Sequence, residues 1–234
     1  MRIHALKAFQ DNYIWIIHDT SSFFCVDPGN ARPVLDYANS KHIDLKAIFI
    51  THEHADHIDG VKQLMQYYPN ASLYMPNRHT KNIKQAPYTF NILQTPGHTD
   101  NHVCYLEPNQ HWLFCGDTLF SAGCGRAFNS IEALFDSLNI LKQLPDHTQI
   151  FCGHEYTRQN LRFAQTVEPD NFIAKQHLDM LETNPEQISL PSSIGFEKKI
   201  NPFLRLDSPS IQAYTGEHTP FAVFKALRAA KDCF

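Results

Sequence analysis

The ten residues from 51 to 60, THEHADHIDG, constrain the fold of this chain more than any other stretch. They place four potential metal ligands within six positions, namely His52, His54, Asp56 and His57. The preceding residues 45–50 are largely apolar, which is typical of a strand buried on both faces. Alternate side chains of an extended chain share a face, so we expect the first two histidines to point the same way. The adjacent pair that follows would diverge unless the chain turned there, so we predict a helix from that pair to about Tyr68.

Three other places repeat one local pattern, an extended segment followed by glycine and then by a potential ligand. They are Gly97-His98, Gly116-Asp117 and Gly153-His154. Glycine lets a chain that leaves a strand turn sharply. Ligands that follow strand ends can converge at one edge of a sheet. The candidate ligands therefore number seven, five histidines and two aspartates.

Seven ligands are too many for one tetrahedral ion, because a structural zinc takes four protein ligands and a catalytic zinc takes three plus water. We therefore predict two metal ions that share a carboxylate. The first ion would be bound by His52, His54 and His98, and the second by Asp56, His57 and His154. Asp117 would bridge the two ions. Imidazole and carboxylate without thiolate suit Zn²⁺, and also Fe²⁺ or Mn²⁺.

The order of apolar and turn-forming stretches predicts a layered α/β architecture. Strands are expected at 12–18, 23–26, 45–50, 72–75, 89–94, 102–106, 111–115 and 149–152. Helices are expected near Pro33, at 131–144 with Ser130 as N-cap, and at 156–167. From about Glu168 helical spacing replaces strand-like runs. That region contains a helix capped by Asp170 with Phe172, Ile173, Leu178 and Leu181 on its apolar side, a connection from 184 to 209, and a last helix from Thr219-Pro220. We predict one domain over residues 1–168 and a helical domain over 169–234.

Composition limits the class of protein. The 234 residues carry a formal net charge of −4, which argues against a general nucleic-acid or anionic-membrane binder. Residues 1–7 lack the apolar stretch of a signal peptide, and no run approaches transmembrane length, so we expect a cytoplasmic protein. We also expect a monomer. Four of the six cysteines lie in strand-like runs and are expected to be buried, reduced thiols. The nine histidines outside the ligand set, His79 and His102 among them, follow no ligand spacing and are expected to be surface or core residues.

Several motifs resemble those of known families. The segment HEHADH at 52–57 is similar to the signature H-x-H-x-D-H of the metallo-β-lactamase superfamily. The remaining motifs resemble the hydroxyacylglutathione hydrolase (glyoxalase II) family: GHT at 97–99, GDTLF at 116–120, GCGR at 123–126, CGHEYT at 152–157, NPFLR at 201–205 and KALRAAKD at 225–232. The resemblance thus spans both predicted domains.

The resemblance implies an αββα sandwich with a helical C-terminal domain, two metal ions, and a small-molecule substrate. The implied reaction is hydrolysis of S-D-lactoylglutathione to glutathione and D-lactate, the second step of methylglyoxal detoxification. The family's substrate-binding positions carry over to Arg126, Tyr156, Arg228 and Lys231. Lys225, Arg228 and Lys231 are three apart on the last predicted helix, so they form one basic stripe. Two positions depart from the family pattern. Phe128 occupies a position where tyrosine is frequent, and Asp59 occupies one where glycine is common.

Two zinc ions would lower the pKa of a water between them to ~7, so we expect a metal-bridging hydroxide to attack the thioester carbonyl, with Asp56 and Asp117 as the catalytic carboxylates. The leaving thiolate has an intrinsic pKa of about 8.5 and needs no strong general acid. Three alternatives remain open: a dinuclear phosphodiesterase or nuclease, a di-iron electron-transfer or oxygen-reducing protein, and a non-catalytic metal-binding protein. The net charge disfavours the first, and His54, where di-iron relatives typically have a carboxylate, disfavours the second. An assay for ester, thioester or phosphodiester hydrolysis separates the third.

Overall fold

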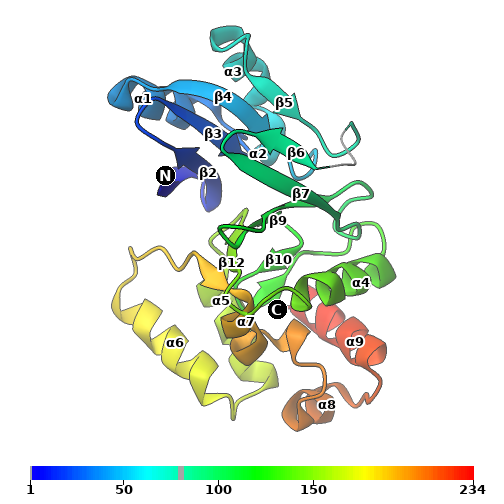
Figure 1. Ribbon diagram of the computed structural model, residues 1–234. Coiled ribbons are helices and arrows are strands. Elements are labelled where there is room, and N and C mark those ends of the chain that lie inside the picture. Colours follow the sequence, from blue (N-terminus) through cyan, green and yellow to red (C-terminus); the bar gives the residue numbers. More distant parts are fainter. Residues whose placement is uncertain (1, 79–81) are drawn as a thin grey trace.

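Two β-sheets packed face to face between helices make up the computed structural model, which describes residues 2–78 and 82–234 (Figure 1). The first sheet has the order β1-β2-β3-β4-β5, with β1 (Arg2–Ala8), β2 (Asn12–His18), β3 (Ser22–Val26), β4 (Asp44–Phe49) and β5 (Ser72–Tyr74). The pairs from β1 to β3 are antiparallel, and those from β3 to β5 are parallel. His79, one of the histidines considered above, lies outside the described residues.

The second sheet has the order β13-β12-β9-β8-β7-β6. Its strands are β6 (Ile83–Gln85), β7 (Tyr88–Gln94), β8 (Val103–Glu107), β9 (Trp112–Gly116), β12 (Gln149–Cys152) and β13 (Ser192–Ser193). A short hairpin of β10 (Leu119–Phe120) and β11 (Gly123–Cys124) follows β9. Since β7 and β9 are both antiparallel to β8, and β12 is parallel to β9, these three strands run in one direction. Their carboxyl ends therefore meet at the same edge of the sheet.

Large aromatic side chains fill the space between the two sheets. Phe49 of the first sheet lies 4.8 Å from Phe90 of the second, measured between ring centroids. Trp15 and Phe151 form a second contact across the interface, at 5.0 Å and nearly edge to face. Each buried aromatic ring contributes roughly 1.5–3 kcal/mol through the surface it removes from water. Both faces of the first sheet are covered, which explains why almost every residue of β2 is buried.

Helices cover the outer faces of both sheets. On the first sheet, α1 (Ala31–Lys41) and α3 (Val61–Tyr67) pack Val34 and Leu64 against β-strand residues such as Ile48. On the second sheet lie α4 (Ile131–Lys142), α5 (Thr157–Val167) and α9 (Pro220–Asp232), and the lower part of Figure 1 also holds α6 (Phe172–Thr183), α7 (Ile194–Ile200) and α8 (Pro209–Thr215). The predicted αββα sandwich is confirmed. Among the described residues, none of the helices has the length and apolar character needed to cross a bilayer.

The predicted strands are confirmed within one or two residues at their ends, but the helix predicted from Asp56 to Tyr68 is wrong. It is two helices, α2 (Ala55–Ile58) and α3, separated at Asp59 and Gly60. The Gly60 N–H donates to the Pro28 carbonyl at 3.0 Å, and a Cβ at this glycine would lie 2.3 Å from that oxygen. Asp59 has φ −61° and ψ −25°, an ordinary conformation for any residue, so the turn has no need of glycine there.

Three details of the C-terminal region also differ from the prediction. Asn171, not Asp170, caps α6, because its side chain accepts the Ala174 N–H. Phe172 and Ile173 are 78% and 46% exposed, so the buried side of α6 consists of Ala174, Leu178 and Leu181. The expected connection from 184 to 209 contains β13, α7 and a 3₁₀ turn at Pro202–Leu204. Strand β13 pairs with β12 of the second sheet, and the division of the chain near residue 168 stays a prediction.

Candidate functional site

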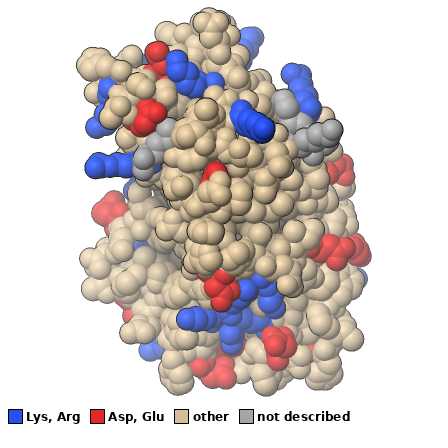
Figure 2. All heavy atoms as spheres, viewed as in Figure 1, with Lys and Arg blue, Asp and Glu red and all other residues tan. Residues whose placement is uncertain are grey.

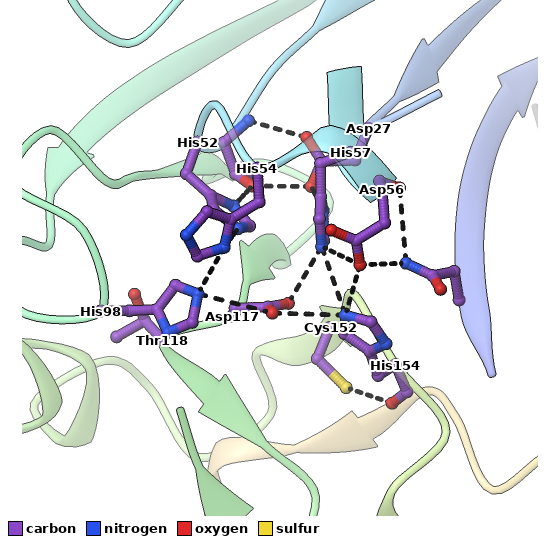
Figure 3. A network of polar contacts seen from close by, with 12 residues as sticks. Asp27, His52, His54, Asp56, His57, His98, Asp117, Thr118, Cys152 and His154 are labelled. Carbon is purple, nitrogen blue, oxygen red and sulfur yellow. Dashed lines mark hydrogen bonds and ion pairs between the residues drawn. The ribbon is translucent and has the colours of Figure 1, made fainter. Parts of the chain in front are cut away.

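All seven candidate ligands lie together at one end of the sandwich (Figure 3). Two follow β4, two lie on α2, and the other three follow β7, β9 and β12, whose carboxyl ends meet. The glycines before the ligands act in different ways. Gly116 has φ +46°, a left-handed conformation that favours glycine, whereas a Cβ at Gly153 would lie 2.5 Å from Asp117 Oδ1.

The first group consists of His52, His54 and His98, as predicted. His54 Nδ1 lies 3.0 Å from His52 Nε2 and 3.1 Å from His98 Nε2. A proton on His54 Nδ1 could form a hydrogen bond with only one of these two neighbours at a time. At least one pair of ring nitrogens would therefore face each other with their lone pairs. A cation at that point would resolve the contact, and three imidazoles are a ligand set that zinc accepts.

The second group consists of Asp56, His57 and His154, again as predicted. His57 Nε2 lies 3.3 Å from His154 Nε2. Asp56 Oδ2 lies 3.4 Å from His154 Nε2 and 3.6 Å from His57 Nε2. The same carboxylate oxygen accepts a hydrogen bond from Asn12 Nδ2 at 2.8 Å, which orients it toward the two imidazoles.

Asp117 lies between the two groups. Its Oδ1 is 3.5 Å from His57 Nε2, and its Oδ2 is 3.3 Å from His154 Nε2 and 3.7 Å from His98 Nε2. Oδ1 is buried and has no hydrogen-bond partner among the described residues. Burial alone would raise the pKa of Asp117, but the His57 and His154 imidazoles hold that pKa well below its usual value. A buried carboxylate oxygen without a partner, placed between two sets of imidazoles, fits a ligand shared by two cations.

The outer ring nitrogens of three histidines donate to protein oxygens. His57 Nδ1 donates to Asp27 Oδ2 at 3.1 Å, His154 Nδ1 to Asp11 Oδ1 at 2.8 Å, and His98 Nδ1 to the Arg126 carbonyl at 2.9 Å. Carboxylate and carbonyl oxygens only accept, so in each neutral imidazole the proton sits on Nδ1 and the lone pair on Nε2. Each Nε2 lone pair then points into the site, which is the tautomer that metal binding requires.

The charges of the site favour a positive occupant. Burial alone would lower the pKa of His57, but the Asp117 and Asp27 carboxylates raise it to about 9. By contrast, burial and the His57 and His102 imidazoles lower the pKa of His52. The buried carboxylates of Asp27 and Asp117 thus attract positive charge to the space between the two ligand groups. The ligands around that space are nitrogen and carboxylate atoms, without thiolate. These residues fit two divalent ions.

The set Asp27, His52 and His57 could also be read as a metal site, because its ligand atoms lie close together. Its carboxylate is already fully used, however. Asp27 Oδ1 accepts the Thr51 N–H at 2.7 Å, and Oδ2 accepts the Thr51 hydroxyl at 2.6 Å as well as His57 Nδ1. Asp27 thus orients a ligand from behind and is not free to bind a third ion.

Family models match the chain over most of its length. The model described as "Hydroxyacylglutathione hydrolase C-terminus" matches residues 155–234, the "Metallo-beta-lactamase superfamily" model matches 88–154, and the "Anti-Pycsar protein Apyc1" model matches 3–86. The hydroxyacylglutathione hydrolase of Legionella pneumophila strain Paris is 45% identical, and that of Pseudoalteromonas translucida is 42% identical, each over 100% of both chains. The chain belongs to the hydroxyacylglutathione hydrolase family. It is therefore an enzyme, a hydrolase of the metallo-β-lactamase superfamily.

Solved structures share the fold at lower identity. ETHE1 from Myxococcus xanthus aligns over 100% of this hydrolase and 99% of its own chain, with a TM-score of 0.65 and 24% identity. The BLEG-1 B3 metallo-beta-lactamase aligns over 87% of this chain and 100% of its own, with a TM-score of 0.65 and 21% identity. These likenesses support the sandwich architecture.

A cavity of about 430 Å³ adjoins the candidate metal centre of the hydrolase. Its wall includes five of the candidate ligands, His54, Asp56, His98, Asp117 and His154. The same cavity is lined by all four residues that the family resemblance assigns to substrate binding, namely Arg126, Tyr156, Arg228 and Lys231. The structure thus brings five candidate ligands and all four predicted substrate-binding residues to one space.

These four residues differ in their contacts and in how far they are exposed. The Tyr156 ring stacks on His154, with centroids 4.7 Å apart and an interplanar angle of 6°. Arg126 is largely exposed, whereas Arg228 is only 4% exposed and donates from Nη1 to the Cys124 carbonyl at 2.9 Å. Lys231 is half-buried, and its ammonium lies 4.9 Å from the centroid of the Phe234 ring.

The predicted basic stripe on the last helix is not a single surface. Lys225 is exposed, Arg228 is buried, and Lys231 stands between aromatic rings. Arg228 Nη2 also pairs with Asp232 Oδ1 at 3.0 Å, while its buried Nε has no hydrogen-bond partner within the described part of the chain. Arg228 lines the cavity, but its unpaired donor is buried and both of its Nη atoms bind oxygens of the protein.

Sequence reasoning missed the residues that support the ligands. Asp27 was read only as part of a turn signal, and His102 was grouped with the surface and core histidines. Asp27 has φ +52°, which aims its carboxylate at Thr51 and His57. The available sequence signal for Asp27 was its position as an acidic residue directly after an apolar, strand-like run. The only sequence signal for His102 was its position four residues after the candidate ligand His98.

Proposed function

We propose that this enzyme hydrolyses S-D-lactoylglutathione to glutathione and D-lactate, with two divalent ions held by the seven ligands described above. The observation that carries the proposal is the single cavity lined both by Asp56 and Asp117 and by Arg126 and Lys231. Zinc is the proposed metal, because imidazole and carboxylate ligands without thiolate suit it, although iron or manganese would also fit such ligands. We further propose a cytoplasmic monomer with a catalytic domain over 1–168 and a helical substrate-binding domain over 169–234.

The ligands would act by holding the reacting centre in one geometry. Two bound divalent ions supply a nucleophile from water near neutral pH and polarise the substrate carbonyl. Asp117 would keep the two groups of ligands at a fixed separation, because it contacts His57 and His154 on one side and His98 on the other. Asp56, oriented by Asn12, would accept the proton released when water is activated. The departing thiolate has an intrinsic pKa of about 8.5, so no side chain has to protonate it.

The far end of the cavity would bind the glutathione part. A glutathione thioester carries two carboxylates and one ammonium. Apart from the candidate metal ligands, the charged residues of the described chain that line the cavity are three cations, Arg126, Arg228 and Lys231, and one carboxylate, Asp232, so the charges of wall and substrate complement each other. Charged hydrogen bonds to a carboxylate contribute about 1.5–3 kcal/mol each.

The face seen in Figure 2 also bears on the phosphodiesterase or nuclease alternative. Basic and acidic side chains are interspersed over it, and one group of basic side chains in its lower half is bordered by acidic ones. A nuclease would be expected to carry an extended basic surface for a polyanion. The net charge of −4 likewise disfavours a polyanionic substrate.

The test is a steady-state comparison of S-D-lactoylglutathione, bis(p-nitrophenyl) phosphate and nitrocefin on one sample whose metal content is measured. We expect the thioester to be hydrolysed with kcat/KM in the ordinary enzyme range, about 10⁴–10⁸ M⁻¹s⁻¹, and the other two far more slowly. A lactoyl thioester of N-acetylcysteamine, which lacks the two carboxylates, is the matched control for the cationic end. Faster turnover of the phosphodiester would refute the proposed function in favour of a dinuclear phosphodiesterase.

A further inference from the structure

We propose that His102, which belongs to neither ligand group, is a positioning residue that fixes the ligands Asp117 and His52 for metal binding. The inference rests on the two-metal centre proposed above. His102 lies immediately before β8, fully buried, and its backbone is fixed on both sides. Its carbonyl accepts the Thr95 N–H at 2.9 Å, and the next residue, Val103, donates its N–H to the Thr51 carbonyl at 2.9 Å.

The imidazole of His102 holds the backbone of Asp117. The Asp117 N–H donates to His102 Nε2 at 3.1 Å. A backbone N–H can only donate, so Nε2 must carry a lone pair and the ring proton must sit on Nδ1. Nδ1 has the Thr95 and Thr118 hydroxyls within 3.0 Å as acceptors for that proton. Both ring nitrogens are therefore used, and the ring has one orientation that satisfies them.

The same ring supports His52. The two imidazoles stack with centroids 4.9 Å apart and an interplanar angle of 25°. His52 Nδ1 lies 3.1 Å from the Thr51 hydroxyl, so its edge is fixed by Thr51 and its face by His102. A flat contact of this kind limits rotation about the bond that would turn Nε2 of His52 away from His54.

The turn before Asp117 is built around this contact. Gly116 has φ +46°, and a Cβ there would lie 2.8 Å from His102 Nε2 and 2.3 Å from the Thr51 hydroxyl. The backbone thus passes close to Nε2 of the imidazole as it enters Asp117. His102 consequently links one ligand of the first group to the residue shared by both groups, although it points no atom at either metal position.

The experiment measures how firmly the zinc-loaded enzyme retains its ions. Zinc transfer to a chromophoric chelator is followed for wild type, His102→Leu and His102→Gln, and the d–d spectrum of each Co²⁺-loaded protein is recorded. Leucine keeps an apolar volume but accepts no hydrogen bond, whereas the glutamine amide oxygen can reach the position of Nε2. Asn171→Ala, which removes buried hydrogen bonds of the α6 cap far from the ligands in sequence, is the stability control.

We expect His102→Leu to weaken zinc retention by about 10- to 100-fold and to alter the Co²⁺ spectrum, and His102→Gln to restore both most of the way. Asn171→Ala should leave zinc retention and the Co²⁺ spectrum unchanged, even if its unfolding temperature falls as far as that of His102→Leu. Wild-type retention and spectrum in His102→Leu would overturn the inference, and so would a glutamine variant as impaired as the leucine one. If His102→Leu does not fold, His102→Asn, whose shorter amide cannot reach the Asp117 N–H, takes its place with the same expected result. A wild-type enzyme that binds fewer than two ions would instead refute the proposed metal centre.

Discussion

Raising the pH should weaken substrate capture through Lys231. Burial and the neighbouring Arg228 and Arg126 cations lower the pKa of its ammonium to about 8, well below the usual value for lysine. The sign follows from that direction: the ammonium is charged below pH 8 and loses its charge as the pH rises through this value. The proposed contact with a glutathione carboxylate needs the charge, so kcat/KM should fall across this range while kcat stays level.

The size of the effect follows from the titration. The charged fraction of a group with a pKa of about 8 falls from ~0.9 at pH 7 to ~0.1 at pH 9, a tenfold change. A charged hydrogen bond contributes about 1.5–3 kcal/mol, so the neutral amine should retain roughly a tenth or less of the activity. The expected fall in kcat/KM between pH 7 and pH 9 is therefore about 5- to 10-fold.

The assay is initial-rate hydrolysis of S-D-lactoylglutathione from pH 6.5 to 9.5, because kcat/KM reports the ionisation of the free enzyme. Lys231→Arg is the matched control, since a guanidinium has a pKa above about 12 and keeps its charge throughout. Titration of the substrate's own ammonium affects both proteins equally and cancels in their ratio. Equal pH profiles for wild type and Lys231→Arg would refute the assigned role of Lys231.

Three further changes test other parts of the site. Asp117→Ala should lower the metal content from near two ions per chain, measured by elemental analysis, because its carboxylate lies between both ligand groups; unchanged stoichiometry would exclude bridging. Arg228→Ala should lower kcat/KM for lactoylglutathione by the loss of about 1.5–3 kcal/mol of transition-state binding free energy. It should also lower the denaturation midpoint, because the buried guanidinium donates to the Cys124 carbonyl. An equal kinetic loss on the N-acetylcysteamine thioester would count against a contact with glutathione. Phe128→Tyr should lower KM by up to about tenfold through one added hydrogen bond without changing the unfolding temperature, because the ring is 66% exposed and lines the cavity; a higher KM would contradict this.

The grouping of the ligands could be predicted because each ligand follows a strand closely in sequence. An extended segment sends His52 and His54 to one side, and a turn sends Asp56 and His57 to the other. The parallel course of β7, β9 and β12 then brings in the three remaining candidates, and two of the three groups of closely placed ligand atoms in the described chain consist of the residues that the sequence grouped. Local geometry was sufficient for the four ligands at 52–57, whereas the convergence of the other three depends on the pairing of strands far apart in the sequence.

Features that depend on long-range contacts could not be predicted in the same way. The helical spacing continues through Gly60, yet the helix breaks there because the backbone lies against the Pro28 carbonyl. The exposure of Phe172 depends on which neighbours α6 meets, and that information is absent from its own sequence. His102 supports Asp117 across 15 residues and two strands, so spacing alone gave it no distinction from other histidines.

The hairpin of β10 and β11 connects the two ends of the site. It begins just after Asp117 and ends just before Arg126, so its position sets the relation between a candidate metal ligand and a cation proposed to bind substrate. Three residues from beyond 168 hold it: Glu197 accepts the Ala122 N–H at 2.7 Å, Asn201 donates to the Gly123 carbonyl at 2.9 Å, and Arg228 donates to the Cys124 carbonyl. All three are buried, so without these partners the hairpin would leave buried polar groups unsatisfied. The helical region therefore holds the segment between Asp117 and Arg126 as well as lining the cavity, and the two ends of the site are expected to lose function together when it is removed.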